Sequence, residues 1–229
     1  DNDGSIVGIF QDEFYGFTRD GSMLFFQPPV TFIEYNPLKG QINTVVLVDT
    51  SLAMHHDLKK LPNGNFLSLD RKDRTITSFP IDVSDQSLVA DVEVIDDVVI
   101  EVDPFGNTVN EWSMMDMLDP RRIGFLSLKQ ISGSYDWGHA NSVSYDEEQD
   151  SILVSLRAQD AIVSFDKAAG TLNYILGNHN NWDSNLHYYL LNPVGEVDWP
   201  YGQHDIQPLG QNRYSLFDNG NYRLIIIYI

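Results

Sequence analysis

Three histidines recur at the same place in a repeated sequence pattern, and their side chains are the ones best suited to chemistry. His56, His139 and His204 each stand at the start of a short strand-like run, which a polar turn and a second apolar run follow. Neutral imidazole is a nucleophile, a proton carrier and a metal ligand near physiological pH. We expect the three side chains to converge on one central site, because equivalent residues of a repeat occupy equivalent places in the fold.

The first repeat contains two adjacent histidines, His55 and His56, and only one of them can be equivalent to His139 and His204. His56 precedes Asp57 as His204 precedes Asp205, so we expect His56 to be the in-phase member. Successive side chains of a strand face opposite sides, so His55 is expected to point away from the site or along its rim.

Arg157 and Asn141 are the further candidates in the middle unit. Arg157 ends the second apolar run and is expected to return to the level of His139. Its planar, permanently charged guanidinium suits an oxyanion such as sulfate, phosphate or carboxylate. The alternative is a surface ion pair with Asp160. Asn141 lies two residues beyond His139 on the same strand face, where its amide either donates a hydrogen bond to the anion or caps an edge.

A metal site is the competing interpretation of the three histidines, because three imidazoles are a known zinc ligand set. Arg157 would repel a cation, and the chain contains no His-x-x-x-His pair. We therefore expect neither a metal nor a cofactor. Cysteine is absent, which excludes thiol catalysis, disulfides and cysteine-based zinc sites.

Strand and turn signals dominate the elements that must position these residues. The histidine phrases predict hairpins with turns at 62–65 and 146–150, and a third hairpin begins at His204. A second phrase, in which Asn or Asp opens a turn and Gly closes it a few residues later, recurs at 35–42, 102–109 and 165–172. The only helix that we expect is a short one at 113–118.

Two alternating hairpins make a four-stranded meander, and several meanders around an axis make a β-propeller. We therefore expect an all-β fold, a β-propeller of four-stranded antiparallel blades, with a sandwich of hairpins as the alternative. The expected units are 52–112 and 138–177, with a half unit at 33–50 and another from 204. Residues 1–32 are an unassigned N-terminal segment or partial blade, and 33–229 form a partial propeller domain.

The net charge of −19 comes from 33 acidic and 14 basic residues. Nucleic acid is not expected as a partner, because phosphate binding requires a basic surface. No apolar run reaches the roughly 18 residues of a membrane span. The polar start at 1–4 shows no signal peptide, although a mature secreted protein would begin in the same way.

Three phrases together give the chain a family resemblance. It resembles the bacterial arylsulfate sulfotransferases that work without the nucleotide sulfate donor. The phrases are His55-His56-Asp57 followed by 61–65, Asp136-Trp137-Gly138-His139 followed by Arg157, and Gly202-Gln203-His204-Asp205 followed by 217–221. The resemblance implies a six-bladed propeller, incomplete in this chain, and a periplasmic or secreted location.

The resemblance also assigns roles. It implies that His204 attacks the sulfur of an aryl sulfate and that the sulfohistidine then passes the sulfuryl group to a phenolic acceptor. Arg157 would supply fixed charge, while His56 and His139 would donate hydrogen bonds and one of them would protonate the leaving phenolate. For Trp137 and Tyr201, apart from the resemblance, core packing is the favoured role, and stacking on the aryl ring is the other role that stays open.

Other functions stay open at this point. One is a non-catalytic propeller that binds a ligand or protein or builds an assembly, and another is a metal-dependent hydrolase built on the three histidines. A homodimer also stays open.

Overall fold

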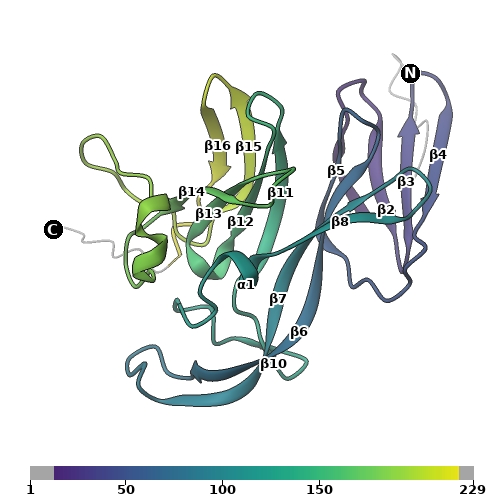
Figure 1. The fold of residues 1–229 in the computed structure, drawn as a ribbon. Helices are drawn as coiled ribbons and strands as arrows, with labels where there is room; N and C mark the ends of the chain where they lie inside the picture. The colour runs from purple at the N-terminus through teal and green to yellow at the C-terminus, as the bar shows by residue number, and fades with distance from the viewer. Residues whose placement is uncertain (1–12, 222–229) are drawn as a thin grey trace, which may run out of the picture.

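The structure, a computed structural model, describes residues 13–221. It is mostly β-sheet, with 50% of residues in strands and 6% in helices, which confirms the expected all-β class. The strands form four sheets in chain order (Figure 1). The first and third are four-stranded antiparallel meanders, the second is a larger sheet of six strands, and the fourth is a single hairpin.

The first sheet consists of β1 (Glu13–Phe17), β2 (Met23–Gln27), β3 (Thr31–Asn36) and β4 (Gln41–Val46). The second contains β5 (His55–Lys60), β6 (Phe66–Pro80), β7 (Val89–Val102), β8 (Thr108–Ser113), β9 (Gln130–Ile131) and β10 (Ser134–Tyr135). The third contains β11 (Ala140–Asp146), β12 (Ser151–Leu156), β13 (Ala161–Asp166) and β14 (Leu172–Gly177). The fourth pairs β15 (His204–Gly210) with β16 (Arg213–Phe217). The helical segments are α1 (Met114–Met117) and the 3-10 turns η1 (Arg157–Gln159) and η2 (Ser184–Tyr189).

All six hairpins that the two phrases predict are present. The histidine phrases form β5–β6, β11–β12 and β15–β16, and the second phrase forms β3–β4, β7–β8 and β13–β14. The β7–β8 turn shows why the second phrase needs its residues. The Asp103 carboxylate accepts the backbone N–H groups of Phe105 and Asn107 at 2.8 and 2.9 Å. Gly106 has a φ of +89°, and a Cβ there would lie 1.9 Å from the Val46 carbonyl oxygen.

The units expected at 52–112 and 138–177 correspond to β5–β8 and β11–β14. The half unit expected at 33–50 belongs instead to a complete sheet, because β1 and β2 precede β3 and β4 and pair with them. These two strands lie in a stretch that carries neither phrase. The boundary expected between residues 32 and 33 falls inside β3, and the division of the chain into domains stays a prediction.

The first strands of the last three sheets lie next to one another. The Asp57 carboxylate of β5 accepts the backbone N–H of Val143 in β11 at 3.1 Å. On the other side of β11, the Ser144 hydroxyl donates to the Ile206 carbonyl of β15 at 2.6 Å, and the Ser142 hydroxyl accepts the Ile206 N–H at 3.1 Å. This side-by-side arrangement of β5, β11 and β15 brings the three histidine phrases together.

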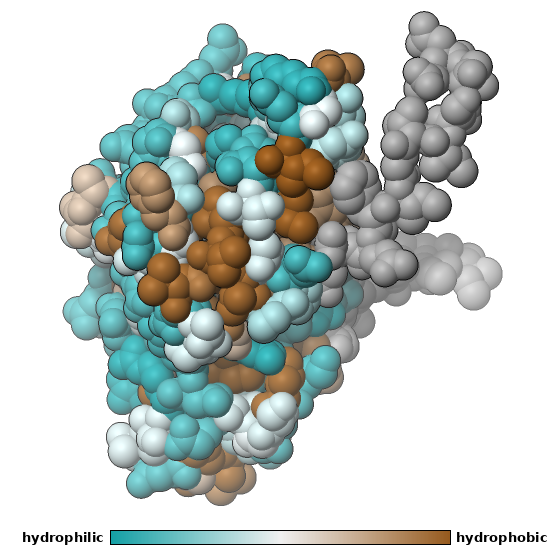
Figure 2. Space-filling view, turned by 90° about the vertical axis from the view of Figure 1, so that its right-hand side faces the viewer, coloured by the Kyte–Doolittle hydropathy of each residue, from teal (hydrophilic) through white to brown (hydrophobic). Residues whose placement is uncertain are grey.

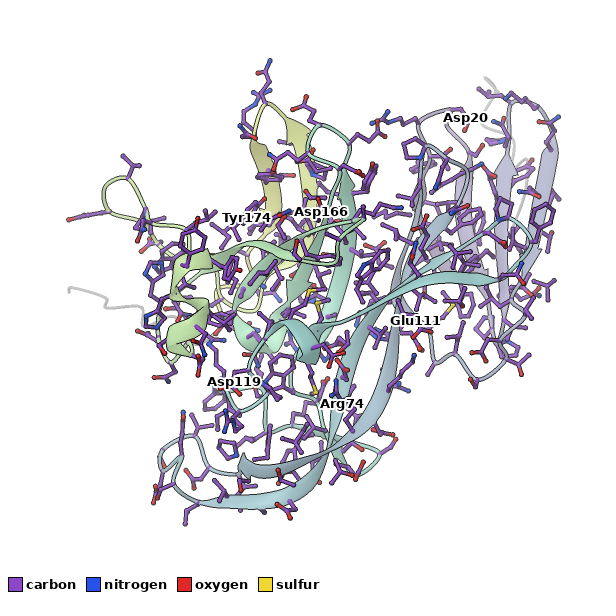
Figure 3. All side chains as sticks on the ribbon, in the orientation of Figure 1. Asp20, Arg74, Glu111, Asp119, Asp166 and Tyr174 are labelled. Atoms are coloured by element: carbon purple, nitrogen blue, oxygen red, sulfur yellow. The ribbon has the colours of Figure 1, made fainter. Side chains whose placement is uncertain are left out.

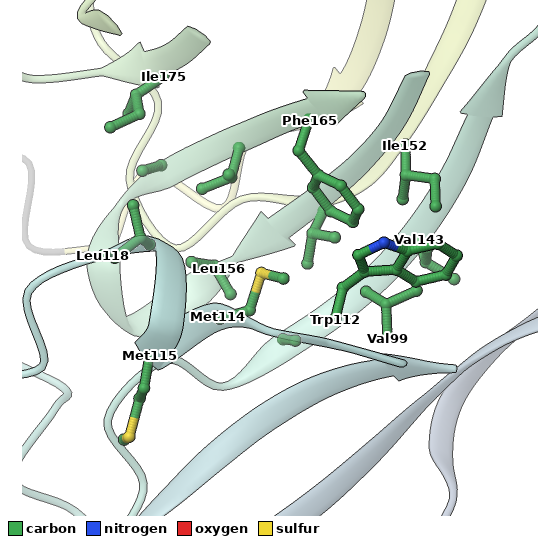
Figure 4. Close-up of a cluster of buried hydrophobic side chains, with 14 of the residues drawn as sticks. Val99, Trp112, Met114, Met115, Leu118, Val143, Ile152, Leu156, Phe165 and Ile175 are labelled. Atoms are coloured by element: carbon green, nitrogen blue, oxygen red, sulfur yellow. The ribbon is translucent and has the colours of Figure 1, made fainter. Parts of the chain in front are cut away.

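The main core lies between the second and third sheets (Figure 4). The rings of Trp112 from β8 and Phe165 from β13 lie 5.7 Å apart there. Helix α1 begins at Ser113, whose hydroxyl caps the Asp116 N–H, and it buries Met114 in the same core. The short helix expected at 113–118 is thus confirmed, and its methionine is a packing residue.

Strands β6 and β7 continue beyond β5 and β8 as a long two-stranded arm. Arg74 of this arm donates to the Asp116 carboxylate at 2.8 Å and to Asp96 at 3.1 Å, which ties the arm to α1 (Figure 3). Strand β10 pairs with β7 in parallel, Tyr135 opposite Val94. The arm therefore supports the chain immediately before His139.

The outer face of the first sheet is apolar. Phe17, Ile42 and Val46 are 69%, 66% and 56% exposed, and Figure 2 shows apolar side chains gathered on this side of the molecule. The opposite face packs Phe32 and Val45 against the second sheet. Within residues 13–221, no helix is long and apolar enough to span a membrane.

Candidate active site

The structure brings the three histidine phrases to one place. His56 lies in β5, His139 directly precedes β11, and His204 is the first residue of β15. The rings of His56 and His139 lie 5.2 Å apart. Burial lowers the pKa of His56, and the neighbouring His139 and His204 lower it further. The Asn141 amide, two residues after His139, donates to the Gln203 carbonyl at 2.8 Å and so brings His204 to the same end of β11.

The ladder registers at the starts of β5 and β15 differ from the phase that the His-Asp dipeptides suggest. His55 pairs with Leu69 as His204 pairs with Phe217, and in both hairpins the regular register resumes three residues later. The residues after these two also match, because His56 and Asp205 both have left-handed φ angles, of +61° and +55°, and His139 shares this conformation with His56 at +48°. His55 is therefore the register equivalent of His204. A β-bulge at the start of each strand causes the difference, since it adds residues that a period of two cannot represent.

Of the two placements expected for His55, away from the site or along its rim, its contacts agree with the second. Its Nδ1 lies 2.7 Å from Nδ1 of His56, so one ring donates a hydrogen bond to the other. Both rings line a cavity of about 50 Å³ together with His139. Burial, with His56 and Arg71 nearby, lowers the pKa of His55 to about 3, so this ring is neutral at physiological pH.

His139 has a carboxylate partner. Its Nδ1 lies 2.5 Å from Oδ2 of Asp136, and the two side chains are 17% and 6% exposed. The backbone at His139 is left-handed, with a φ of +48°. A non-glycine residue in this conformation is uncommon, and such residues cluster at functional sites.

His204 is held by a backbone carbonyl. Its Nδ1 lies 3.0 Å from the Gly202 oxygen and 3.1 Å from the Asn219 amide nitrogen. The Gly202 carbonyl accepts a hydrogen bond from Nδ1 in one tautomer, and the Asn219 amide donates to Nδ1 in the other; in both, Nε2 has no hydrogen-bond partner among the described residues. Burial lowers the pKa of His204, with smaller contributions from Arg157 and His139, while the Gly202 carbonyl opposes the shift. This imidazole is therefore suited to act as a neutral nucleophile.

Arg157 begins η1, and its backbone N–H donates to the His139 carbonyl at 3.2 Å. It thus returns to the level of His139, as the hairpin predicts. Among the described residues it has no ion-pair partner, and its buried Nε has no hydrogen bond. The alternative ion pair with Asp160 is not formed, and that carboxylate accepts the Gly202 N–H at 2.7 Å. The guanidinium charge is left for an anion from outside.

Asn141 lies in β11 and holds the residue that precedes His204. It is 7% exposed, and its amide donates to the Gln203 carbonyl at 2.8 Å, next to His204. Its buried Oδ1 has no partner among residues 13–221. Asn141 therefore holds the start of β15 in place with one of its two amide N–H donors.

The two proposed aryl-stacking residues differ. Trp137 is 0% exposed and donates its indole N–H to the Arg122 carbonyl at 2.7 Å. It takes the core-packing role, because a fully buried ring has no face to offer a substrate. Tyr201 is half-buried beside β15, and its backbone N–H donates to Asp218 at 3.0 Å.

Comparison with known proteins identifies a family for this chain. The sequence profile of the arylsulfotransferase (ASST) family matches residues 1–225. The chain belongs to the arylsulfotransferase family. Two curated relatives, both named arylsulfate sulfotransferase AssT, come from Escherichia coli O6:H1 and Lelliottia amnigena. They are 26% and 25% identical over 180 residues, which cover 58% of this chain and 30% of each relative. The chain thus aligns with about 30% of the length of these relatives.

Two carboxylates beside His139 escaped the sequence reasoning. Asp136 was visible three residues before His139, but nothing in the sequence showed that its side chain turns back to the ring. Asp97 comes from β7, where Oδ1 accepts the Ala140 N–H at 3.0 Å. Complete burial raises the pKa of Asp97 well above its ordinary value. Asp97 is far along the chain from the histidine phrases, so no sequence pattern connected it with the site.

No three His, Asp or Glu side chains among residues 13–221 are grouped so that they could hold a metal ion.

Proposed function

We propose that this protein transfers a sulfuryl group from an aryl sulfate to a phenolic acceptor, with His204 as the covalent nucleophile. The observation that carries the proposal is the pairing of two features. Both contacts of the His204 imidazole, with the Gly202 carbonyl and the Asn219 amide, are made by Nδ1. Among the described residues, Nε2 has no hydrogen-bond partner and Arg157 has no anionic partner. Family membership supports the same chemistry.

In the first half-reaction, the Nε2 lone pair of His204 forms a bond to sulfur while the bond between sulfur and the aryl oxygen breaks. The electron pair leaves with the phenolate, which takes a proton from a neighbouring imidazole. Negative charge on the peripheral sulfuryl oxygens is stabilised by the Arg157 guanidinium and by imidazole N–H groups, as in other loose transfer transition states.

In the second half-reaction, a phenol occupies the place of the product. A neutral imidazole takes the phenol proton, the phenolate oxygen attacks sulfur, and the bond from sulfur to Nε2 breaks. His204 returns to its neutral form, so the cycle is ping-pong and needs no external base.

The proposal extends to the fold. We propose that the first strands β5, β11 and β15 line the central channel of a β-propeller, to which the sheets of this chain contribute blades. Their mutual hydrogen bonds through Asp57, Ser142 and Ser144 support this arrangement. A periplasmic or secreted location is proposed on the family resemblance.

The test mixes the purified protein with 4-nitrophenyl sulfate and a phenol and follows nitrophenolate by absorbance. Release that requires the phenol and survives a chelator supports the transferase. Release without acceptor that a chelator abolishes would instead indicate a metal-dependent hydrolase, and no release from folded protein would favour a binding function.

Two variants make the test specific. His204→Asn is expected to abolish release, while His187→Asn, which changes an exposed histidine of η2, is expected to leave it intact. Full turnover by His204→Asn would refute the nucleophile.

A further inference from the structure

We propose that Asp136 is a positioning residue, and that the His139–Asp136 pair carries the transferred proton in both half-reactions. The inference rests on the proposed sulfuryl transfer. It assigns proton transfer to His139 and not to His56, the other histidine that could perform it.

The three imidazoles of the site are all held through Nδ1. Nδ1 of His56 faces His55 at 2.7 Å, that of His139 faces Asp136 at 2.5 Å, and that of His204 faces the Gly202 carbonyl at 3.0 Å. None of the three Nε2 atoms is hydrogen-bonded to a described residue. Nε2 is therefore the nitrogen that each ring can use toward a substrate.

Only one of these partners compensates a positive ring. A carboxylate at hydrogen-bond distance stabilises an imidazolium, whereas a second neutral imidazole or a carbonyl offers only a dipole. The other charged and titratable groups around the rings are Arg157, Arg71, His55, Asp97 and Asp205. Arg157 disfavours additional positive charge on His56 and His204, Arg71 does so on His55, and Asp205 makes a smaller, opposite contribution at His204 without a hydrogen bond to the ring. His139 is thus the ring that can hold a proton and release it.

The position of Asp136 is fixed by the backbone on both sides. Its N–H donates to the Lys129 carbonyl at 2.8 Å, directly after β10 has paired with the β6–β7 arm. Two residues later, the Gly138 carbonyl accepts the Ala158 N–H at 2.9 Å. A Cβ on Gly138 would lie 2.4 Å from Oδ2 of Asp97, so the loop packs tightly on β7. Such a clamp holds the carboxylate in place without cost at the moment of reaction.

The proton balance follows from this geometry. In the first half-reaction, the His139 imidazolium gives its Nε2 proton to the departing phenolate oxygen and becomes neutral. In the second, Nε2 takes the proton of the acceptor phenol and the imidazolium is restored. Asp136 accepts the Nδ1–H bond in both states, as the carboxylate does beside the histidine of a serine hydrolase.

The experiment compares donors with different leaving groups in wild-type protein and in Asp136→Asn. Unsubstituted phenyl sulfate needs a protonated leaving group more than 4-nitrophenyl sulfate does, because 4-nitrophenolate is the weaker base. We expect kcat/KM for phenyl sulfate to fall about 10²- to 10⁴-fold, the usual size of general acid catalysis. The fall for 4-nitrophenyl sulfate should be at least tenfold smaller. Asp85→Asn, in the distant turn between β6 and β7, is the matched control and should change neither value.

A second set of variants separates positioning from folding. Asp136→Glu should recover part of the phenyl sulfate activity. In a His139→Gln background, Asp136→Asn should cause no further loss, because the carboxylate acts through that ring. If Asp136→Asn does not fold, His139→Gln alone must show the same selectivity between the two donors.

The outcomes distinguish this inference from the proposed function. Wild-type protein without transferase activity would refute the function itself. Active wild-type protein, with equal losses for both donors in Asp136→Asn and in His139→Gln, would overturn the His139–Asp136 assignment alone. An additional large loss from Asp136→Asn in the His139→Gln background would overturn it as well.

Discussion

Replacing Arg157 by methionine should separate function from stability. The guanidinium has no ion-pair partner among the described residues, and its buried Nε makes no hydrogen bond. Its backbone bond to the His139 carbonyl does not depend on the side chain. Removing the charge therefore leaves no buried carboxylate unpaired, while methionine keeps most of the packed volume.

The expected loss of activity can be estimated from the charge. A unit charge about 4 Å from a sulfuryl oxygen, at an effective dielectric constant of about 20, contributes about 4 kcal/mol. Loss of one donor to a developing anion in other enzymes costs about 2.7–4 kcal/mol, or about 10²- to 10³-fold in rate. We expect kcat/KM of Arg157→Met for 4-nitrophenyl sulfate to fall by this factor. The melting temperature should stay within about 2 °C of wild type.

The assay measures initial rates and thermal unfolding on the same preparations. Arg121→Met is the control, since Arg121 is exposed and pairs only with its neighbour Asp119. Activity of Arg157→Met within a few-fold of wild type would refute the oxyanion role. A melting temperature lowered by many degrees would show that Arg157 is a structural residue.

Two further predictions concern stability. Glu101→Ala should lower the free energy of unfolding by about 3 kcal/mol in urea titrations. The reason is that this 1% exposed carboxylate binds Lys167 at 2.8 Å and three asparagine amides. An unchanged midpoint of urea unfolding would contradict this prediction. His55 has a folded-state pKa of about 3 against an ordinary 6.5, so its stability contribution is present above pH 6.5 and is lost as the pH falls toward 3. His55→Gln should flatten the pH dependence of unfolding in this window, and an identical slope in both proteins would count against the neutral buried ring.

The fold was predictable where turn residues carry the information. Asp103 and Gly106 show the reason, because the carboxylate caps the turn and only glycine fits against the Val46 carbonyl. The same signals placed the hairpins that carry His56, His139 and His204. Strands β1 and β2 were missed because their connection at 18–22 matches neither phrase.

The details of the site were less accessible from sequence. The bulges at the starts of β5 and β15 shift the phase of the histidines, and the His-Asp dipeptides hide this shift. The sequence left both core packing and aryl stacking open for Trp137, and only the structure shows that its ring is fully buried. The partnership of Asp136 with His139 depends on a left-handed backbone at His139, which an amino-acid pattern does not specify.

The most direct test of the account is to trap the sulfohistidine. The protein is mixed with 4-nitrophenyl sulfate without acceptor, quenched, digested and examined by mass spectrometry, with His204→Asn in parallel. We predict a burst of nitrophenolate equivalent to the active sites, and the added mass of one SO₃ group on the peptide that contains His204 and on that residue. A phenol added before quenching should remove the label. Turnover to an aryl sulfate product without any label on His204, or a label retained by His204→Asn, would contradict the account.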